Sequence, residues 1–102
     1  MAPGLRSWRG RAGTAENAIL RGQAVGPLFG VQLHVKDNLF VAGSRTTFGS
    51  LLQERNVTSE DCPAVERLRK AGMIVVGRTN TPESGWKGVT DNRLFGITRN
   101  PW

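Results

Sequence analysis

The strongest constraint on the fold is a helical pattern, beginning near Asp61, that passes directly into a short apolar segment. Pro63 suits the first helical turn, where its missing N–H costs no hydrogen bond, and Gly72 suits the position just after the last turn. Between them, apolar residues recur at helical spacing: Ala64, Leu68 and Ala71. The next residues, 73–76, are Met-Ile-Val-Val, which is typical of a strand buried on both faces. Residues 78–102 show little periodicity, so this strand needs cover from elsewhere.

A second strand is predicted before this helix, because apolar and polar residues alternate from Val31 to Lys36. The alternation places Lys36 at the end of the strand, on the same face as Gln32 and His34. A helix between two strands fits a crossover connection, which joins parallel strands. We therefore expect a fold of the α/β class.

Length and composition limit both the size of the core and the kinds of site. The chain of 102 residues allows at most one modest domain, and its hydrophobic share of 38% allows only a small core. The single cysteine, Cys62, cannot form an internal disulfide, and with the single His34 it falls short of the four ligands of a structural zinc site. We expect no metal and no cofactor. No bilayer-spanning apolar run or signal-peptide pattern occurs, so we expect a cytoplasmic protein without a membrane partner.

The formal net charge of +6 raises the question of nucleic-acid binding. Residues 1–13 are predicted to form a basic, irregular leader ahead of a domain at 14–102, with Thr14 capping a short helix that Gly22 ends. Elsewhere acidic and basic residues are interspersed, which favours a solvated surface over a nucleic-acid interface. The competing hypothesis is a small basic module that binds nucleic acid through Arg6, Trp8, Arg9 and Arg11.

Three segments of the chain resemble, in the same order, segments of the amidase signature family. The first, GPLFGV at 26–31 followed by VKD at 35–37, is similar to the strand that bears the family's catalytic lysine. The second, DCPAV at 61–65 with RLRKAG at 67–72 and GRTNTPE at 77–83, is similar to the next helix, strand and loop. The third, GWKGVTD at 85–91 with LFGITRNPW at 94–102, is similar to the approach to a glycine- and serine-rich signature loop.

The resemblance implies a partial amidase-signature fold, a mixed sheet flanked by helices, of which residues 14–102 would be the N-terminal part. It also implies hydrolysis of an amide carbon–nitrogen bond in a small-molecule substrate, without a metal. In that family one serine attacks the carbonyl, and a second, cis-linked serine passes its proton to a neutral lysine. Lys36 matches this lysine, and the resemblance assigns it as the one catalytic residue of the chain. A lysine that acts as a base must lose its proton against an ordinary pKa of about 10.4, which burial in a rigid site favours.

The chain departs from the family pattern beside this lysine. Gln32 and His34 stand where the family commonly has a proline and a small residue, and Arg78 stands where it usually has a lysine. A bulkier pair beside Lys36 is expected either to alter the pocket or to mark a non-functional copy, whereas the arginine is expected to be tolerated.

Both serines of the triad are expected in the signature loop, which would begin shortly after Trp102. The chain is therefore expected to be truncated before that loop and catalytically incomplete alone. Its own candidate serines lack the glycine-flanked context of the reactive loop: Ser44, Ser50, Ser59 and Ser84. One alternative to a fragment is one half of a split amidase or amidotransferase subunit, completed by a second chain that supplies the serines.

Overall fold

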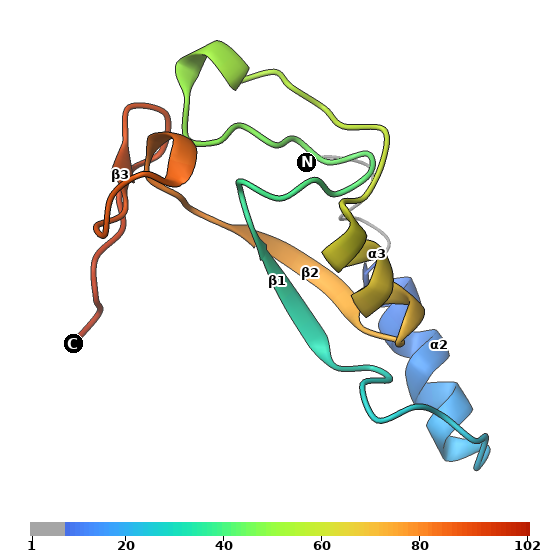
Figure 1. Ribbon diagram of the computed structural model, residues 1–102. Coiled ribbons are helices and arrows are strands. Elements are labelled where there is room, and N and C mark those ends of the chain that lie inside the picture. Colours follow the sequence, from blue (N-terminus) through green and yellow to red (C-terminus); the bar gives the residue numbers. More distant parts are fainter. Residues whose placement is uncertain (1–7) are drawn as a thin grey trace.

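A computed structural model describes residues 8–102, and its elements follow one another as a helix, a strand, a helix and a strand, ending in a small hairpin (Figure 1). The helices and strands are α2 (Trp8–Leu20), β1 (Gln32–Lys36), α3 (Pro63–Lys70), β2 (Ile74–Thr79), β3 (Asp91–Asn92) and β4 (Gly96–Ile97). Two short 3-10 helices are η1 (Leu51–Gln53) and η2 (Glu83–Gly85). The expected α/β class is confirmed. The elements β1 and α3 occupy the residues that the sequence pattern indicated, whereas β2, predicted at 73–76, runs from Ile74 to Thr79 and passes through Gly77.

The strands β1 and β2 are parallel and hydrogen-bonded, as the predicted crossover through α3 requires. Their register contains a bulge: Leu33 is opposite Val75, but His34 is opposite Gly77, which leaves Val76 as the extra residue of β2. The bulge shifts the side-chain alternation of β2 by one position. Residues 75 and 78 therefore point to the same face of the sheet, although an unbroken strand would place them on opposite faces.

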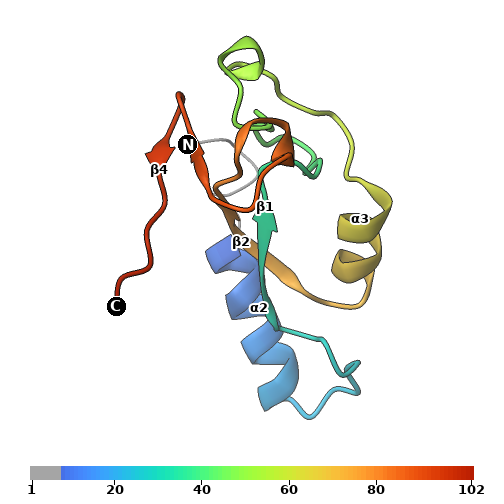
Figure 2. The same cartoon turned by 60° about the vertical axis from the view of Figure 1, so that its left-hand side comes forward.

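The two faces of this small sheet carry different helices (Figure 2). The face under α3 contains the core cluster, in which Val35 and Val75 of the strands pack against Val65 of α3 and Val41 of the following loop. The opposite face is covered by α2, whose Ala15 is buried near Ile74. The core is as small as the composition predicted, because each face of the sheet is covered by one short helix.

Helix α2 begins earlier than the sequence pattern predicted. It starts at Trp8, so the prediction of an irregular leader is wrong for residues 8–13, while residues 1–7 lie outside the described chain. Thr14 lies inside the helix, where its hydroxyl donates to the carbonyl of Gly10 at 3.0 Å, and it is not the N-cap. Trp8 and Ala12 of the first turns face Ile74 and Val76 of β2, and such tertiary contacts explain the longer helix because they override weak local propensity. The division into a leader and a domain at residue 14 stays a prediction.

Both helices end at the glycines that the sequence pattern indicated. Gly22 and Gly72 have φ of +67° and +96°, which L side chains rarely adopt. The N–H groups of Gly72 and Met73 donate to the carbonyls of Arg69 and Leu68, which satisfies the last turn of α3. The chain then enters β2 at once.

The sequence pattern predicts no helix or strand in residues 78–102, where the structure has the end of β2, η2 and the β3–β4 hairpin. The side chain of Asn92 organises it: its Oδ1 accepts the N–H groups of Leu94 and Phe95, at 3.0 and 2.6 Å. Its Nδ2 donates to the carbonyl of Thr81 at 2.7 Å, which ties the hairpin to the end of β2. Side-chain hydrogen bonds, rather than apolar periodicity, define this segment.

The described chain is more extended than a self-contained domain. Its radius of gyration is 15.4 Å, against about 13 Å for a compact domain of this length. Large apolar side chains are exposed along its length, among them Leu52, Trp86 and Ile97. No helix in residues 8–102 is both long and apolar enough to cross a membrane.

Candidate active site

Lys36 is the last residue of β1, at the carboxyl end of the parallel pair. The backbone on both sides of it is fixed: the N–H of Asp37 donates to the carbonyl of Thr79 at 2.9 Å, and the carbonyl of Lys36 accepts the N–H of Leu39 at 3.0 Å. Its side chain is exposed and has no ion pair or hydrogen bond within residues 8–102. A rigid strand end thus presents a lysine whose amine is unengaged by the described residues.

The residue after Lys36 is at the centre of a buried polar cluster. Oδ1 of Asp37 lies 3.1 Å from Nη2 of Arg78, and the two side chains are only 6% and 13% exposed. The same Oδ1 accepts the N–H of Thr47 at 3.1 Å, while the Thr47 hydroxyl donates to Oδ2. Nη2 of Arg78 also donates to the hydroxyl of Thr46 at 3.0 Å. These four residues, here called the strand-end cluster, join β1, β2 and the loop after β1.

The loop that supplies Thr46 and Thr47 is folded tightly against the end of β2. Phe48 and Gly49 both have positive φ, of 55° and +67°. The N–H of Phe48 donates to the carbonyl of Asp37 at 2.9 Å, and the carbonyl of Phe48 accepts the N–H of Ser84 at 2.8 Å. The loop therefore links the lysine-bearing strand to η2.

Gln32 and His34 lie on the same face of β1 as Lys36, as the alternation predicted, and both are exposed. His34 lies against β2 at Gly77, where an added Cβ would stand 3.3 Å from its Cδ2. The face that leads along β1 to Lys36 is thus lined by an amide and an imidazole.

The other candidates from the sequence are not brought to Lys36. Ser44 and Ser50 are buried and Ser59 and Ser84 are exposed, and none of them hydrogen-bonds the lysine within the described residues. Cys62 packs against the core cluster, in keeping with a structural role. No group of three or more His, Cys, Asp or Glu residues suited to a metal occurs in the part of the chain that the structure describes.

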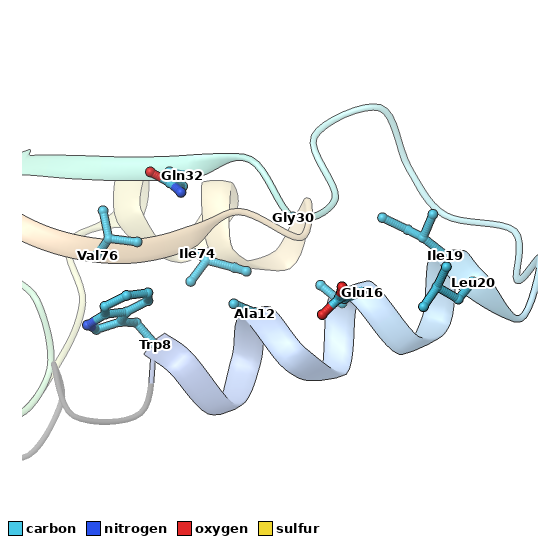
Figure 3. A pocket seen from close by; sticks show the side chains of 10 residues that line it. Trp8, Ala12, Glu16, Ile19, Leu20, Gly30, Gln32, Ile74 and Val76 are labelled. Carbon is cyan, nitrogen blue, oxygen red and sulfur yellow. The ribbon is translucent and has the colours of Figure 1, made fainter.

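A cavity of about 310 Å³ lies between α2 and the strands, away from the carboxyl ends of the strands (Figure 3). Trp8, Ile74 and Val76 line it, with Gln32 at its edge, and Lys36 is not among its lining residues. Trp8 faces the sheet across this cavity, and the guanidinium of Arg9 lies 5.3 Å from its ring centroid. The proposed stacking of a base on Trp8 gains no support from this arrangement.

Comparison with known proteins identifies the family of this chain. A family model described as "Amidase" matches residues 7–102. The chain belongs to the amidase signature family. Acylamidase of Rhodococcus erythropolis is 48% identical over 81 residues, which make up 79% of this chain and 17% of that protein. One subunit of the glutamyl-tRNA(Gln) amidotransferase of Synechococcus sp. (strain CC9605) is 42% identical over 94 residues, 92% of this chain and 19% of that protein.

The solved structures of amidase signature enzymes share the fold of this segment. Native peptide amidase from Stenotrophomonas maltophilia superposes with a TM-score of 0.77 at 32% identity, over 93% of this chain and 20% of the enzyme. The expected partial amidase-signature fold is thereby confirmed. The chain spans between 17% and 20% of the length of these three relatives.

Sequence reasoning located Lys36 in this amidase segment but missed the strand-end cluster. Asp37 and Arg78 are far apart in the sequence, and an unbroken strand would have placed Arg78 on the wrong face. The signal in the sequence was a group of small polar residues, which are buried in the structure and not solvated loop residues: Ser44, Thr46, Thr47 and Ser50.

Proposed function

We propose that this chain supplies the lysine-bearing strand of an amidase that hydrolyses amide carbon–nitrogen bonds, with Lys36 as the base. In this role Lys36 takes the proton of a bridging serine, which in turn activates the serine that attacks the amide carbonyl. The observation that carries the proposal is the position of Lys36: at the carboxyl end of a parallel strand, with its backbone fixed and its amine unengaged. Ligand sites in α/β sheets lie outside such strand ends.

The same geometry indicates that a further segment of chain is required for catalysis. A lysine base has to be held neutral by burial, but the side chain of Lys36 is exposed in this chain. The serines of residues 8–102 do not hydrogen-bond it, and none lies in a glycine-flanked loop that resembles the reactive loop of the family. We therefore propose that residues 1–102 are inactive alone, and that the segment with both serines also covers Lys36.

The names of the relatives indicate the class of substrate. The names of two of them, acylamidase and peptide amidase, describe enzymes that act on amides. We accordingly propose a small-molecule amide as the substrate.

The test uses a hybrid amidase, in which this chain replaces the matched segment of the Rhodococcus acylamidase. Turnover of a simple N-acyl aniline is compared for the hybrid and for Lys36→Arg, which keeps the positive charge but cannot act as a base near neutral pH. Lys70→Arg is the matched control, because Lys70 is an exposed lysine on α3 whose pairing with Glu66 is at the surface. We expect Lys36→Arg to abolish turnover and Lys70→Arg to leave it unchanged.

Two results would contradict the proposal. Turnover by the Lys36→Arg hybrid would show that Lys36 is not the base. Turnover by residues 1–102 without any added segment, lost on Lys36→Arg, would show that the chain contains its own nucleophile. Mixing residues 1–102 with the separately produced remainder of the acylamidase tests whether the two parts work as a split enzyme.

A further inference from the structure

We propose that Arg78 is a positioning residue for Lys36, acting through Asp37 and the loop at residues 46 and 47. The inference rests on the proposed function of Lys36 and adds to it the part of the chain that holds this base in place. Its starting point is the strand-end cluster, in which one buried guanidinium joins β2 to the residue next to Lys36 and to the following loop.

The bulge in the sheet makes this contact possible. Leaving Val76 as the extra residue places Arg78 opposite Val35, on the face where the Asp37 carboxylate lies. Asp37 is then held from β2 twice, by the backbone hydrogen bond to Thr79 and by the ion pair with Arg78. Bulges commonly re-aim side chains next to active sites.

Stability alone does not explain this arginine. A buried ion pair is often no more stable than apolar residues of the same volume. In addition, Nε and Nη1 of Arg78 are buried without a hydrogen-bond partner in the described residues, which carries a desolvation cost. A cation in this position is better explained by what it joins, because one nitrogen, Nη2, reaches both the Asp37 carboxylate and the Thr46 hydroxyl.

The consequence for catalysis concerns placement, not binding. Arg78 does not act on the substrate in this proposal, because it is linked to Lys36 only through Asp37. Loss of the ion pair would free the Asp37 carboxylate from Arg78 and loosen the loop after β1. The side chain of Lys36 would then leave the strand in a less fixed direction. A displacement of about 1 Å in a catalytic group can lower the rate about 100-fold.

The experiment compares two ion pairs of the hybrid amidase that have the same N–O distance and similar burial but lie at different places. Arg69 and Asp61 form the second pair, also 3.1 Å apart and 19% and 14% exposed, and Asp61 likewise accepts one backbone N–H, from Ala42. Arg78→Met is expected to lower kcat about 100-fold with little change in KM. Arg69→Met is expected to lower the unfolding temperature without changing kcat.

The conservative variant Arg78→Lys tests whether a cation with several donors is sufficient at this position. Arg78→Lys keeps a cation with several donors and is expected to recover most of the kcat lost in Arg78→Met. If Arg78→Met does not fold, Asp37→Asn and Asp61→Asn replace the two methionine variants, with the same contrast expected. All rates are measured well below the unfolding temperature of each variant.

Four outcomes overturn the proposal. Equal loss of kcat in Arg78→Met and Arg69→Met would make Arg78 a stabilising residue only, and so would an Arg78→Lys variant that is no better than Arg78→Met. An unchanged kcat in Arg78→Met, with Lys36→Arg inactive, would remove the positioning role and leave the proposed function intact. If Lys36→Arg stays active, the proposed function itself fails, and the role of Arg78 falls with it.

Discussion

Replacement of Gly49 by alanine tests how tightly the loop after β1 is packed against the end of β2. Gly49 is buried and has a φ of +67°, and a Cβ added there would lie 2.7 Å from the carbonyl oxygen of Thr81 and 3.2 Å from the backbone nitrogen of Glu83. Both neighbours are backbone atoms, so neither can swing away as a side chain would. Gly43 provides the matched control, because it has a φ of +70° and nothing within 4 Å of the added Cβ.

The two substitutions share one destabilising effect and differ in the other. Alanine in the left-handed region costs about 1 to 2 kcal/mol at either position. At Gly49 the steric conflict adds roughly 1 to 3 kcal/mol, the usual cost of extra atoms in a packed interior. The stability loss of Gly49→Ala is therefore expected to be about twice that of Gly43→Ala or more.

Pulse proteolysis of the hybrid amidase in urea measures this difference. The measured quantity is the urea concentration at which half of the protein is cleaved, for the unchanged hybrid, Gly43→Ala and Gly49→Ala. We expect the midpoint to fall slightly for Gly43→Ala and at least twice as far for Gly49→Ala. Equal shifts would refute the reasoning, because they would mean that the loop at residue 49 and the segment at 81–83 are not in contact.

Two further predictions concern the stability of the chain. Residues 1–102 alone are expected to show no sharp, cooperative thermal transition by circular dichroism, because each face of the two-stranded sheet has little cover; a sharp transition of the monomer would contradict this. In the hybrid, Val65→Ala, which truncates a side chain 1% exposed in the core, is expected to cost about 2 kcal/mol. Val57→Ala, at a side chain 61% exposed, is expected to change stability by less than about 0.5 kcal/mol, as urea unfolding would show.

The elements predicted from the sequence are those with a strong local pattern. The apolar spacing of α3, Pro63 at its start and Gly72 at its end determined the bounds of this helix almost completely. Alternation determined β1 and which face of it carries Lys36. These features depend on neighbours within a few residues, so a sequence is sufficient to reveal them.

The start of α2 and the β3–β4 hairpin were missed because their causes are not local. The glycines of α2 argue against an early helix start, and contact with β2 overcomes that weak propensity. The hairpin depends on the side-chain amide of Asn92, which reaches Thr81 in another segment. Polar contacts of this kind leave no periodicity in the sequence.

The sequence by itself determined that this chain belongs to the amidase signature family, because the residues around Lys36 and two later segments match that family in order. Only the tertiary structure decided how the lysine is held. The bulge at Val76 turns Arg78 toward Asp37, and a shift of one residue in strand pairing reverses the face of every later side chain. No local pattern encodes that shift, since it arises from the fit of two strands that lie far apart in the chain.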